Sequence, residues 1–283
     1  MKKILTVLAF FSLINFHVAL AEITKTSILS PIELAIQHAD SETLVIFDVD
    51  DVLITVKDQI LQSEYEKFLE ELNKKLESRT SEEEAQKFWS IIYLTRIDEL
   101  VDPRMVALIK EAQAKGLKVM AFTNAWTGTF GNIPSLEDWR LNELADFGYT
   151  FKDSWSALKP KTFEALKSQD PKRFPVFKDG IVFTSNLPKD EVLKAFLEYA
   201  SLSPKKIIFI DDKSKNLKSV EAFCQKTGIK FTGFEYIAVA ERPKSPLNEK
   251  RAQLQFEVLE KEHQWLSDEE ADKLKQNGQR YEP

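Results

Sequence analysis

Four short apolar runs constrain the fold of this chain more than any other feature of its sequence. Each run is continuous and rich in β-branched or aromatic residues, which is typical of a strand buried on both faces of a parallel sheet. The runs are 43–47 (TLVIF), 118–122 (KVMAF), 180–184 (GIVFT) and 206–210 (KIIFI). Segments with helical spacing, 103–115 and 189–199, precede two of them. Helices that alternate with buried strands predict an α/β fold with a doubly wound parallel sheet, to which 229–234 is expected to add an edge strand.

The composition excludes several classes of protein. Of the 283 residues, 43% are hydrophobic and 30% are charged, as in an ordinary globular protein rather than a disordered one. The net charge of −6 does not favour nucleic acid or an anionic membrane as a partner. The three histidines and the single Cys224 form no zinc or nucleophile motif. If the chain is an enzyme, its chemistry therefore depends on carboxylates, hydroxyls and lysines.

The N-terminus has the pattern of a signal peptide. Lys2 and Lys3 precede a mostly apolar stretch, 4–16, and Ala-Leu-Ala at 19–21 matches the small-x-small cleavage pattern. We therefore predict a signal peptide at 1–21 and export of a bacterial protein to the periplasm or beyond it as a secreted protein. No second apolar run of about 20 residues follows, so we expect no stable membrane insertion after cleavage.

Two charged helical segments interrupt the alternation of strands and helices. Segment 57–101 is predicted to be a small helical insertion, and 246–283 a helical tail. The tail carries an apolar stripe that we expect to pack on the core, with a partner-binding helix as the alternative. The stripe comprises Leu254, Val258, Leu259 and Trp265. The core would then consist of 22–56 and 102–245.

A second insertion, 125–179, is expected within that core. It contains three tryptophans, Trp126, Trp139 and Trp155. Packing in the core is the expected role of these rings, and a share in covering a functional site is the alternative.

Polar residues follow the buried runs at the positions where the strands end. The first run is followed by Asp48 and Asp50, the second by Thr123 and Asn124, and the fourth by Asp211 and Asp212. Ligands of open parallel sheets bind at the carboxyl ends of the strands, so we expect these side chains to converge. Converging carboxylates repel one another unless a hard cation such as Mg²⁺ lies among them. With the metal, and with a hydroxyl and backbone N–H groups from the second strand, the cluster predicts a phosphate site.

The order of these motifs resembles a known signature. VIFDVDDVL, then AFTNA, then a lysine-bearing helix start and finally IIFIDD are similar to the four motifs of the haloacid dehalogenase superfamily, which is dominated by Mg²⁺-dependent phosphatases. The similarity spans about 43–236 and looks closest to a branch of bacterial members that carry signal peptides. It implies a Rossmann-like fold in which segment 57–101 is a cap over the site.

The resemblance also implies a role for each motif residue. Asp48 matches the nucleophile that takes the phosphoryl group as an aspartyl-phosphate, and Asp50 matches the general acid-base residue. Thr123 matches the phosphoryl-binding hydroxyl. The implied metal ligands are Asp211 and Asp212, with Asp48 and the backbone carbonyl of Asp50.

Two lysines compete for the role of the phosphate-binding cation. Lys189 begins the helix that leads into the strand ending at Asp211, where the helix N-terminus also favours phosphate. Lys159 belongs to a Lys-Pro sequence but is separated from Asp211 by an intervening strand. We therefore prefer Lys189. Asp51 departs from the resembling pattern, because many relatives have glycine there, and it is expected to crowd the turn or to add charge near the metal.

The predicted function is that of an exported Mg²⁺-dependent phosphomonoester hydrolase acting on a small phosphorylated substrate. Two alternatives remain open. One is a catalytically idle protein that keeps the fold to bind a ligand, and the other is a phosphotransferase that passes the phosphoryl group to an alcohol.

Overall fold

The computed structural model describes residues 22–168 and 170–276. The strands in these ranges are β1 (Glu22–Thr26), β2 (Thr43–Phe47), β3 (Ile54–Val56), β4 (Asp98–Leu100), β5 (Lys118–Thr123), β6 (Lys161–Thr162), β7 (Val176–Lys178), β8 (Ile181–Phe183), β9 (Lys206–Asp211) and β10 (Lys230–Tyr236). The α-helices are α1 (Ser30–Gln37), α2 (Glu66–Glu77), α3 (Glu82–Thr95), α4 (Arg104–Ala114), α5 (Leu136–Asp146), α6 (Lys189–Tyr199), α7 (Ser214–Thr227), α8 (Glu249–Glu262) and α9 (Asp268–Gln276).

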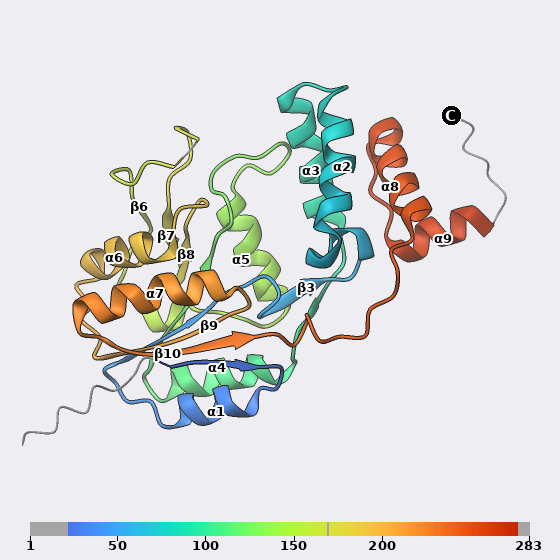
Figure 1. The fold of residues 1–283 in the computed structure, drawn as a ribbon. Helices are drawn as coiled ribbons and strands as arrows, with labels where there is room; N and C mark the ends of the chain where they lie inside the picture. Colours follow the sequence, from blue (N-terminus) through green and yellow to red (C-terminus); the bar gives the residue numbers. More distant parts are fainter. Residues whose placement is uncertain (1–21, 169, 277–283) are drawn as a thin grey trace, which may run out of the picture.

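One mostly parallel sheet forms the centre of the molecule (Figure 1). Its strand order is β1-β10-β9-β2-β5-β8-β7-β6. Neighbours from β1 to β8 pair in parallel, whereas β7 and β6 add antiparallel strands at one edge. The prediction of an α/β fold with a parallel sheet is confirmed.

The edge position predicted for segment 229–234 is wrong. The segment does form β10, but β10 lies inside the sheet because β1 pairs along its outer side. The sequence of β1, EITKT, is short and contains no apolar run, so its pairing could not be recognised from local pattern.

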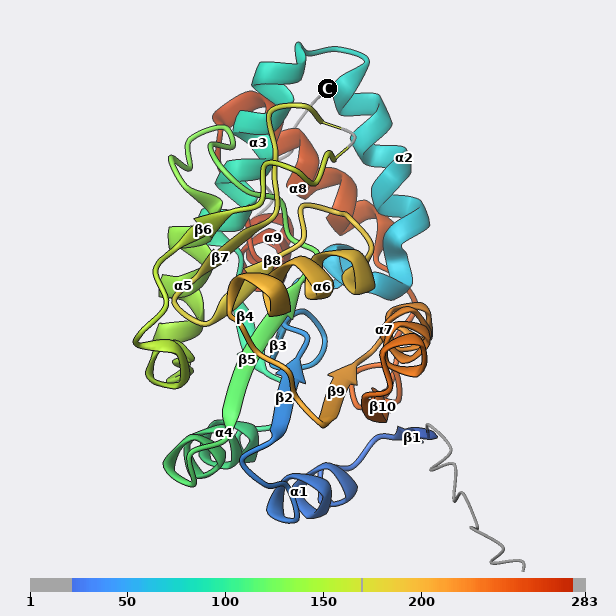
Figure 2. The ribbon, with the colours of Figure 1, turned by 90° about the vertical axis from the view of Figure 1, so that its left-hand side faces the viewer.

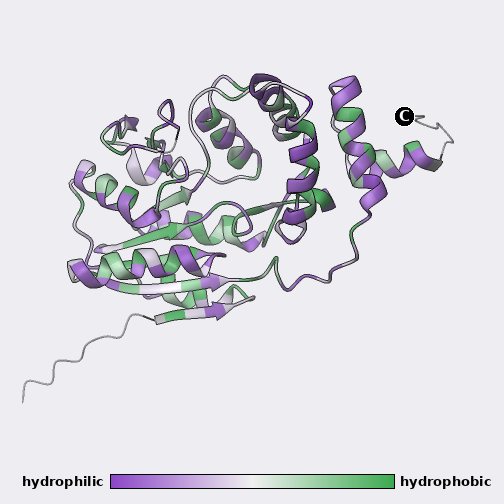
Figure 3. Cartoon of the chain, turned by 45° about the horizontal axis from the view of Figure 1, so that its top comes forward, coloured by the Kyte–Doolittle hydropathy of each residue, from purple (hydrophilic) through white to green (hydrophobic). Residues whose placement is uncertain are grey.

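Helices cover both faces of the sheet, which explains why the strands are apolar without alternation. Successive side chains of a strand point to opposite faces. Val45 and Phe47 of β2 therefore pack with α1 and α4, whereas Leu44 and Ile46 pack with α6 and α7. The strands in the middle of the sheet are accordingly coloured largely hydrophobic in Figure 3, while the helices carry both colours.

The insertion and the tail form a separate hydrophobic cluster beside the sheet. Helices α2 and α3 rise from a two-stranded ribbon, β3–β4, and α8 lies against them (Figure 2). Phe256 and Trp265 of the tail are buried with Leu72 and Phe88 of the insertion. The prediction that the tail packs on the core is wrong, because these buried side chains of the tail pack on the insertion. The physical reason is that the tail covers the apolar face of the short helical pair.

Polar contacts hold the insertion and the tail together as well. The carboxylate of Asp58 is buried and accepts hydrogen bonds from the Trp265 indole Nε1 (2.8 Å) and from the backbone N–H of Asp268 (3.0 Å). The side-chain amide of Gln59 donates to the carbonyl of Pro246 (3.1 Å), and its Oε1 accepts from the N–H of Asn248 (3.0 Å). The tail therefore fixes the first turn of the insertion.

Phe256→Ala tests whether this contact stabilises the protein. The Phe256 ring is 6% exposed and its centroid lies 5.7 Å from that of Trp265, so truncation leaves a cavity. We expect a loss of about 3–5 kcal/mol in the free energy of unfolding, measured by urea denaturation. Leu34→Ala is the control, because Leu34 is 56% exposed on α1 and should change stability little. Equal effects of the two substitutions would contradict the prediction.

Among the residues that the structure describes, no helix combines the length and apolarity needed to cross a bilayer. The signal peptide predicted for 1–21 and the last residues of the tail, 277–283, lie outside the described residues.

Candidate functional site

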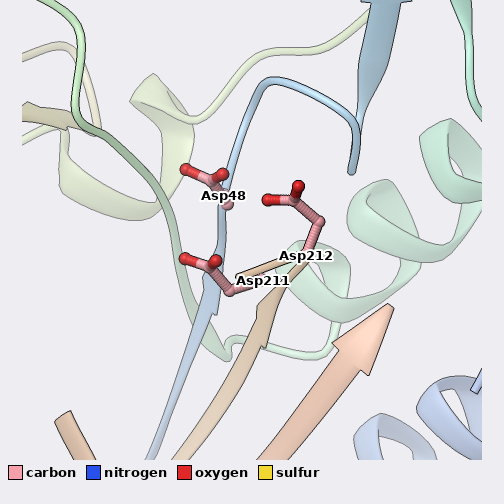
Figure 4. A group of neighbouring side chains, drawn as sticks. All are labelled: Asp48, Asp211 and Asp212. Carbon is pink, nitrogen blue, oxygen red and sulfur yellow. The ribbon is translucent and has the colours of Figure 1, made fainter. Parts of the chain in front are cut away.

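Three carboxylates meet where β2 and β9 end. Asp48 directly follows β2, Asp211 is the last residue of β9, and Asp212 comes next. The two strands are adjacent and parallel, and the N–H of Asp48 donates to the carbonyl of Ile210 (2.8 Å). One ligand oxygen from each of the three carboxylates lies within 4.8 Å of the others (Figure 4). Clustered carboxylate oxygens are the donors that Mg²⁺ prefers, so these residues fit the predicted metal.

The ammonium group of Lys189 lies inside this cluster. Lys189 begins α6 and is 2% exposed. Its Nζ donates to Asp48 Oδ1, to Asp211 Oδ2 and to the carbonyl of Phe122, each at 2.7 Å. The same Nζ lies 5.4 Å and 5.2 Å from the ring centroids of Phe122 and Phe209. All three ammonium donors are therefore used, and the charge is held in a fixed position.

Lys159 lies elsewhere. It is exposed, does not line the cavity described below, and its carbonyl accepts a hydrogen bond from the Tyr199 hydroxyl (2.7 Å). Of the two lysines considered from the sequence, the structure brings only Lys189 to the carboxylates.

Burial and mutual repulsion shift the protonation of the cluster. Burial raises the pKa of Asp48 well above its usual value; Lys189 opposes this, and Asp211 and Asp212 raise the pKa further. Burial also raises the pKa of Asp212 to about 6, against the effect of the Lys213 ammonium at 2.6 Å. The pKa of Lys189 is raised because its carboxylate partners outweigh the effect of burial. Negative charge is thus in excess at this point, and a cation would relieve it.

Two residues that support Asp211 were missed in the sequence. The Asn216 side-chain amide donates to both Asp211 oxygens (3.0 and 3.1 Å), and the backbone N–H of Lys213 donates to Oδ1 (2.8 Å). Asn216 lies in the first turn of α7. The sequence feature that could have indicated this role is a polar side chain that follows the Asp-Asp pair closely.

The Asp50 carboxylate stands apart from the cluster. Its side chain is 55% exposed and forms an ion pair with Arg140 of α5 (3.1 Å). Arg140 is itself buried and also binds Glu143 (2.5 Å). The metal role predicted for Asp50 concerned its backbone carbonyl and stays a prediction. Nothing in the local sequence pointed to Arg140, which lies in the middle of the second insertion.

Asp51 occupies a position that favours glycine. Its φ of 61° lies in the left-handed region, which explains why a glycine is suited to this turn. Hydrogen bonds from the hydroxyls of Thr55 (2.6 Å) and Ser63 (3.0 Å) hold its carboxylate. Its charge contributes to the raised pKa of Asp212. Asp51 is therefore accommodated in the turn, and it adds charge near the cluster.

Thr123 and Asn124 lie at the end of the neighbouring strand, β5. Thr123 is 1% exposed, and its Oγ1 accepts a hydrogen bond from the N–H of Ala125 (3.1 Å). The Asn124 side-chain oxygen accepts from the Thr184 hydroxyl (3.0 Å). Both residues line the same cavity as Asp48.

A cavity of about 1040 Å³ opens above the strand ends. Its floor includes residues predicted from the sequence, namely Asp48, Asp50, Thr123, Asn124 and Asp212. Its walls come from α2 and α3 of the first insertion and from the second insertion. Of the three tryptophans expected in the core, only Trp155 is buried there, whereas Trp126 and Trp139 line the cavity.

The chain is similar to proteins of Rickettsia and Chlamydia. An uncharacterized protein of Rickettsia prowazekii (strain Madrid E) is 24% identical over 86% of each chain. Two proteins of Chlamydia pneumoniae, each named "Putative outer membrane protein", are 26% identical; one covers 84% of this chain and 85% of its own, the other 69% of each. No solved structure matches the chain.

The family comparison corrects the assignment drawn from the motifs. Residues 25–272 match a family described as "Protein of unknown function (DUF2608)", and no haloacid dehalogenase family matches. The assignment to that superfamily is not supported, because short motifs at strand ends can resemble one another without a match along the whole chain. The chain belongs to the DUF2608 family.

Proposed function

We propose that this protein is an exported Mg²⁺-dependent phosphomonoester hydrolase that acts through an aspartyl-phosphate on Asp48. The observation that carries the proposal is the placement of Asp48. It is buried at a strand end, bound to Lys189 and clustered with Asp211 and Asp212, and it faces the large cavity. Helices on both faces of the sheet support a doubly wound, Rossmann-like arrangement, in which ligands bind at this edge.

The proposed reaction has two steps. The first step requires Asp50 to be protonated when the substrate binds. The Asp48 carboxylate attacks phosphorus, the bond to the leaving oxygen breaks, and the protonated Asp50 gives that oxygen a proton and becomes a carboxylate paired with Arg140. Asp50 then takes a proton from a water that attacks the same phosphorus, which releases phosphate and restores the Asp48 carboxylate. Thr123 would bind a phosphoryl oxygen. Lys189 would hold Asp48 in place and offset negative charge there, and it would bind a phosphoryl oxygen only by exchanging one of the three acceptors that it contacts in this structure.

Mg²⁺ held by Asp48, Asp211 and Asp212 would neutralise negative charge on the phosphoryl group. Arg140 would position the Asp50 side chain for the reaction. Its ion pair holds the Asp50 carboxylate at the cavity, within the space that a leaving group would enter.

Export is part of the proposal. The pattern of residues 1–21 supports it, and so do the names of the Chlamydia relatives, which refer to the outer membrane. The substrate would then be a small phosphorylated compound outside the cytoplasm.

Phosphate release tests the proposal. The purified protein is incubated with an aryl phosphate and a panel of phosphorylated metabolites, with Mg²⁺ or with EDTA. We expect release with Mg²⁺, loss of at least about 100-fold with EDTA, and recovery when excess Mg²⁺ is added. Asp146→Asn, which removes an exposed carboxylate at the end of α5, should leave the rate unchanged.

Other outcomes would replace the proposal. Phosphate transferred to added glycerol, without release, would identify a phosphotransferase. Mg²⁺ binding without turnover of any substrate would favour the idle binding protein. Turnover that is equal with Mg²⁺ and with EDTA would overturn the metal dependence.

A further inference from the structure

Trp126 is a large ring at the cavity wall with an accessible surface. It is 42% exposed, whereas most large apolar side chains described in the structure are buried. It lies three residues after Thr123 and two after Asn124, on the loop that leaves β5. The ring therefore stands close along the chain to the proposed phosphate-binding residues.

A buried arginine holds one side of this ring. The Arg173 guanidinium carbon lies 4.8 Å from the Trp126 ring centroid, in a cation–π contact. Arg173 is 7% exposed and donates to the carbonyls of Thr127 and Thr129 and to Asp170. Trp126 also meets Phe130 edge to face at 5.8 Å. The indole is thus anchored on one face and along one edge.

The other rings that line the cavity already contact neighbouring aromatic or charged side chains. The Trp89 ring centroid lies 6.3 Å from that of Tyr93 and 6.5 Å from that of Phe256. Tyr93 and Trp139 stack on each other with centroids 5.2 Å apart and an angle of 14°, and Tyr93 also stacks on Phe130 at 5.6 Å. Arg96 and Arg140 lie 5.5 Å and 4.8 Å from the Trp139 centroid. These contacts leave Trp126 as the described ring of the wall best placed to accept a flat group from a ligand.

The loop that follows β8 lies beside Trp126, with the Asn186 side-chain amide against the indole N–H, and is held by backbone contacts. Ser185 and Asn186 have φ values of 51° and 63°, and their N–H groups donate to the carbonyls of Ala125 (3.1 Å) and Asn124 (3.2 Å). Asn124 and Asn186 both line the cavity. A flat group on Trp126 would therefore have amide groups close by.

We propose that Trp126 is a stacking platform that selects phosphomonoesters whose leaving group carries a planar aromatic ring. The inference rests on the proposed function, because it places the phosphoryl group at Asp48. Both an aryl phosphate and a nucleoside monophosphate combine a phosphoryl group with a planar aromatic ring, so both fit this description. The cavity of about 1040 Å³ lies at the upper end of the range for drug-sized ligands, so a three-carbon phosphate would leave most of it unfilled.

Equilibrium binding and turnover together test the inference. Affinities are measured by calorimetry with Mg²⁺ in the Asp48→Asn background, which should bind these compounds without turning them over, for 1-naphthyl phosphate and adenosine 5′-monophosphate, and for ribose 5-phosphate and glycerol phosphate. We expect the aromatic pair to bind about tenfold more tightly, because stacking on an aromatic side chain contributes that order of affinity. Turnover of the same four compounds by the wild-type chain is measured in parallel.

Substitutions separate stacking from simple bulk. Trp126→Leu should bring the aromatic compounds to within about twofold of the other pair, whereas Trp126→Phe should keep most of the preference. Leu34→Ala is the control for loss of an exposed apolar side chain outside the cavity. A melting temperature for each variant shows whether the fold is retained.

The outcomes distinguish this inference from the proposed function. Equal affinity for all four compounds, or a preference that persists in Trp126→Leu, would overturn the platform even if every compound is hydrolysed. The expected binding pattern without turnover would support the platform and contradict the hydrolase. A preference for only one of the two aromatic compounds would support the platform and show whether the site takes an aryl phosphate or a nucleoside monophosphate.

Discussion

Asp48→Asn is expected to abolish phosphate release while leaving the protein folded. An asparagine amide carries no charge and cannot form the aspartyl-phosphate, so the rate should fall by at least about 10³-fold. The measurement is phosphate release under saturating Mg²⁺, with Asp146→Asn as the charge-matched control on the surface.

The stability of Asp48→Asn should not fall with its activity. Burial and nearby carboxylates raise the pKa of Asp48, so its ionisation costs stability as the pH rises above the ordinary carboxyl range. The variant removes that cost, and Lys189 keeps its contact with Asp211. We expect a melting temperature at pH 7 equal to or above that of the wild type. Retained activity, or loss of both activity and fold, would contradict the role given to Asp48.

Lys189→Met should strongly reduce the stability of the protein. The substitution leaves Asp48 and Asp211 buried without the ammonium group that both of them contact at 2.7 Å. Breaking a buried ion pair from one side costs about 3–5 kcal/mol in the free energy of unfolding. Urea denaturation in EDTA measures this loss.

Mg²⁺ should restore part of the stability that Lys189→Met removes. A cation that binds only the folded state stabilises it in proportion to the logarithm of its concentration. Without the lysine charge in the cluster, the gain on adding Mg²⁺ should exceed that of the wild type. Lys205→Met is the control, because Lys205 pairs with Glu42 on the surface, where ion pairs contribute little. A variant as stable as this control, or one that Mg²⁺ does not stabilise, would contradict the cluster as a cation site.

Much of the sheet and its ligand edge could be predicted from short stretches of sequence. The run at 43–47 forms β2 with the predicted bounds, and 189–199 forms α6. An apolar strand between two helical layers leaves its pattern within a few residues, because both of its faces are buried. The carboxylates that follow β2 and β9 come together for the same reason, since parallel neighbouring strands end at the same edge.

Residues distant in the sequence decided the remaining features. Arg140 reaches Asp50 from α5, and the tail covers the insertion rather than the sheet. Neither contact leaves a local pattern, because each depends on where separate elements dock.

The family of the chain also could not be predicted from short stretches of sequence. Four short motifs pointed to one superfamily, whereas the match along 25–272 placed the chain in another family.

Local sequence was thus sufficient for the α/β class, for the strand ends and for the acidic residues there, because backbone alternation and burial operate over a few residues. The contacts of Lys189 with both carboxylates, the support of Asp50 by Arg140 and the exposure of Trp126 at the cavity were decided only by the tertiary structure. Each arises from side chains that meet across elements, and their contacts depend on packing that no single segment contains.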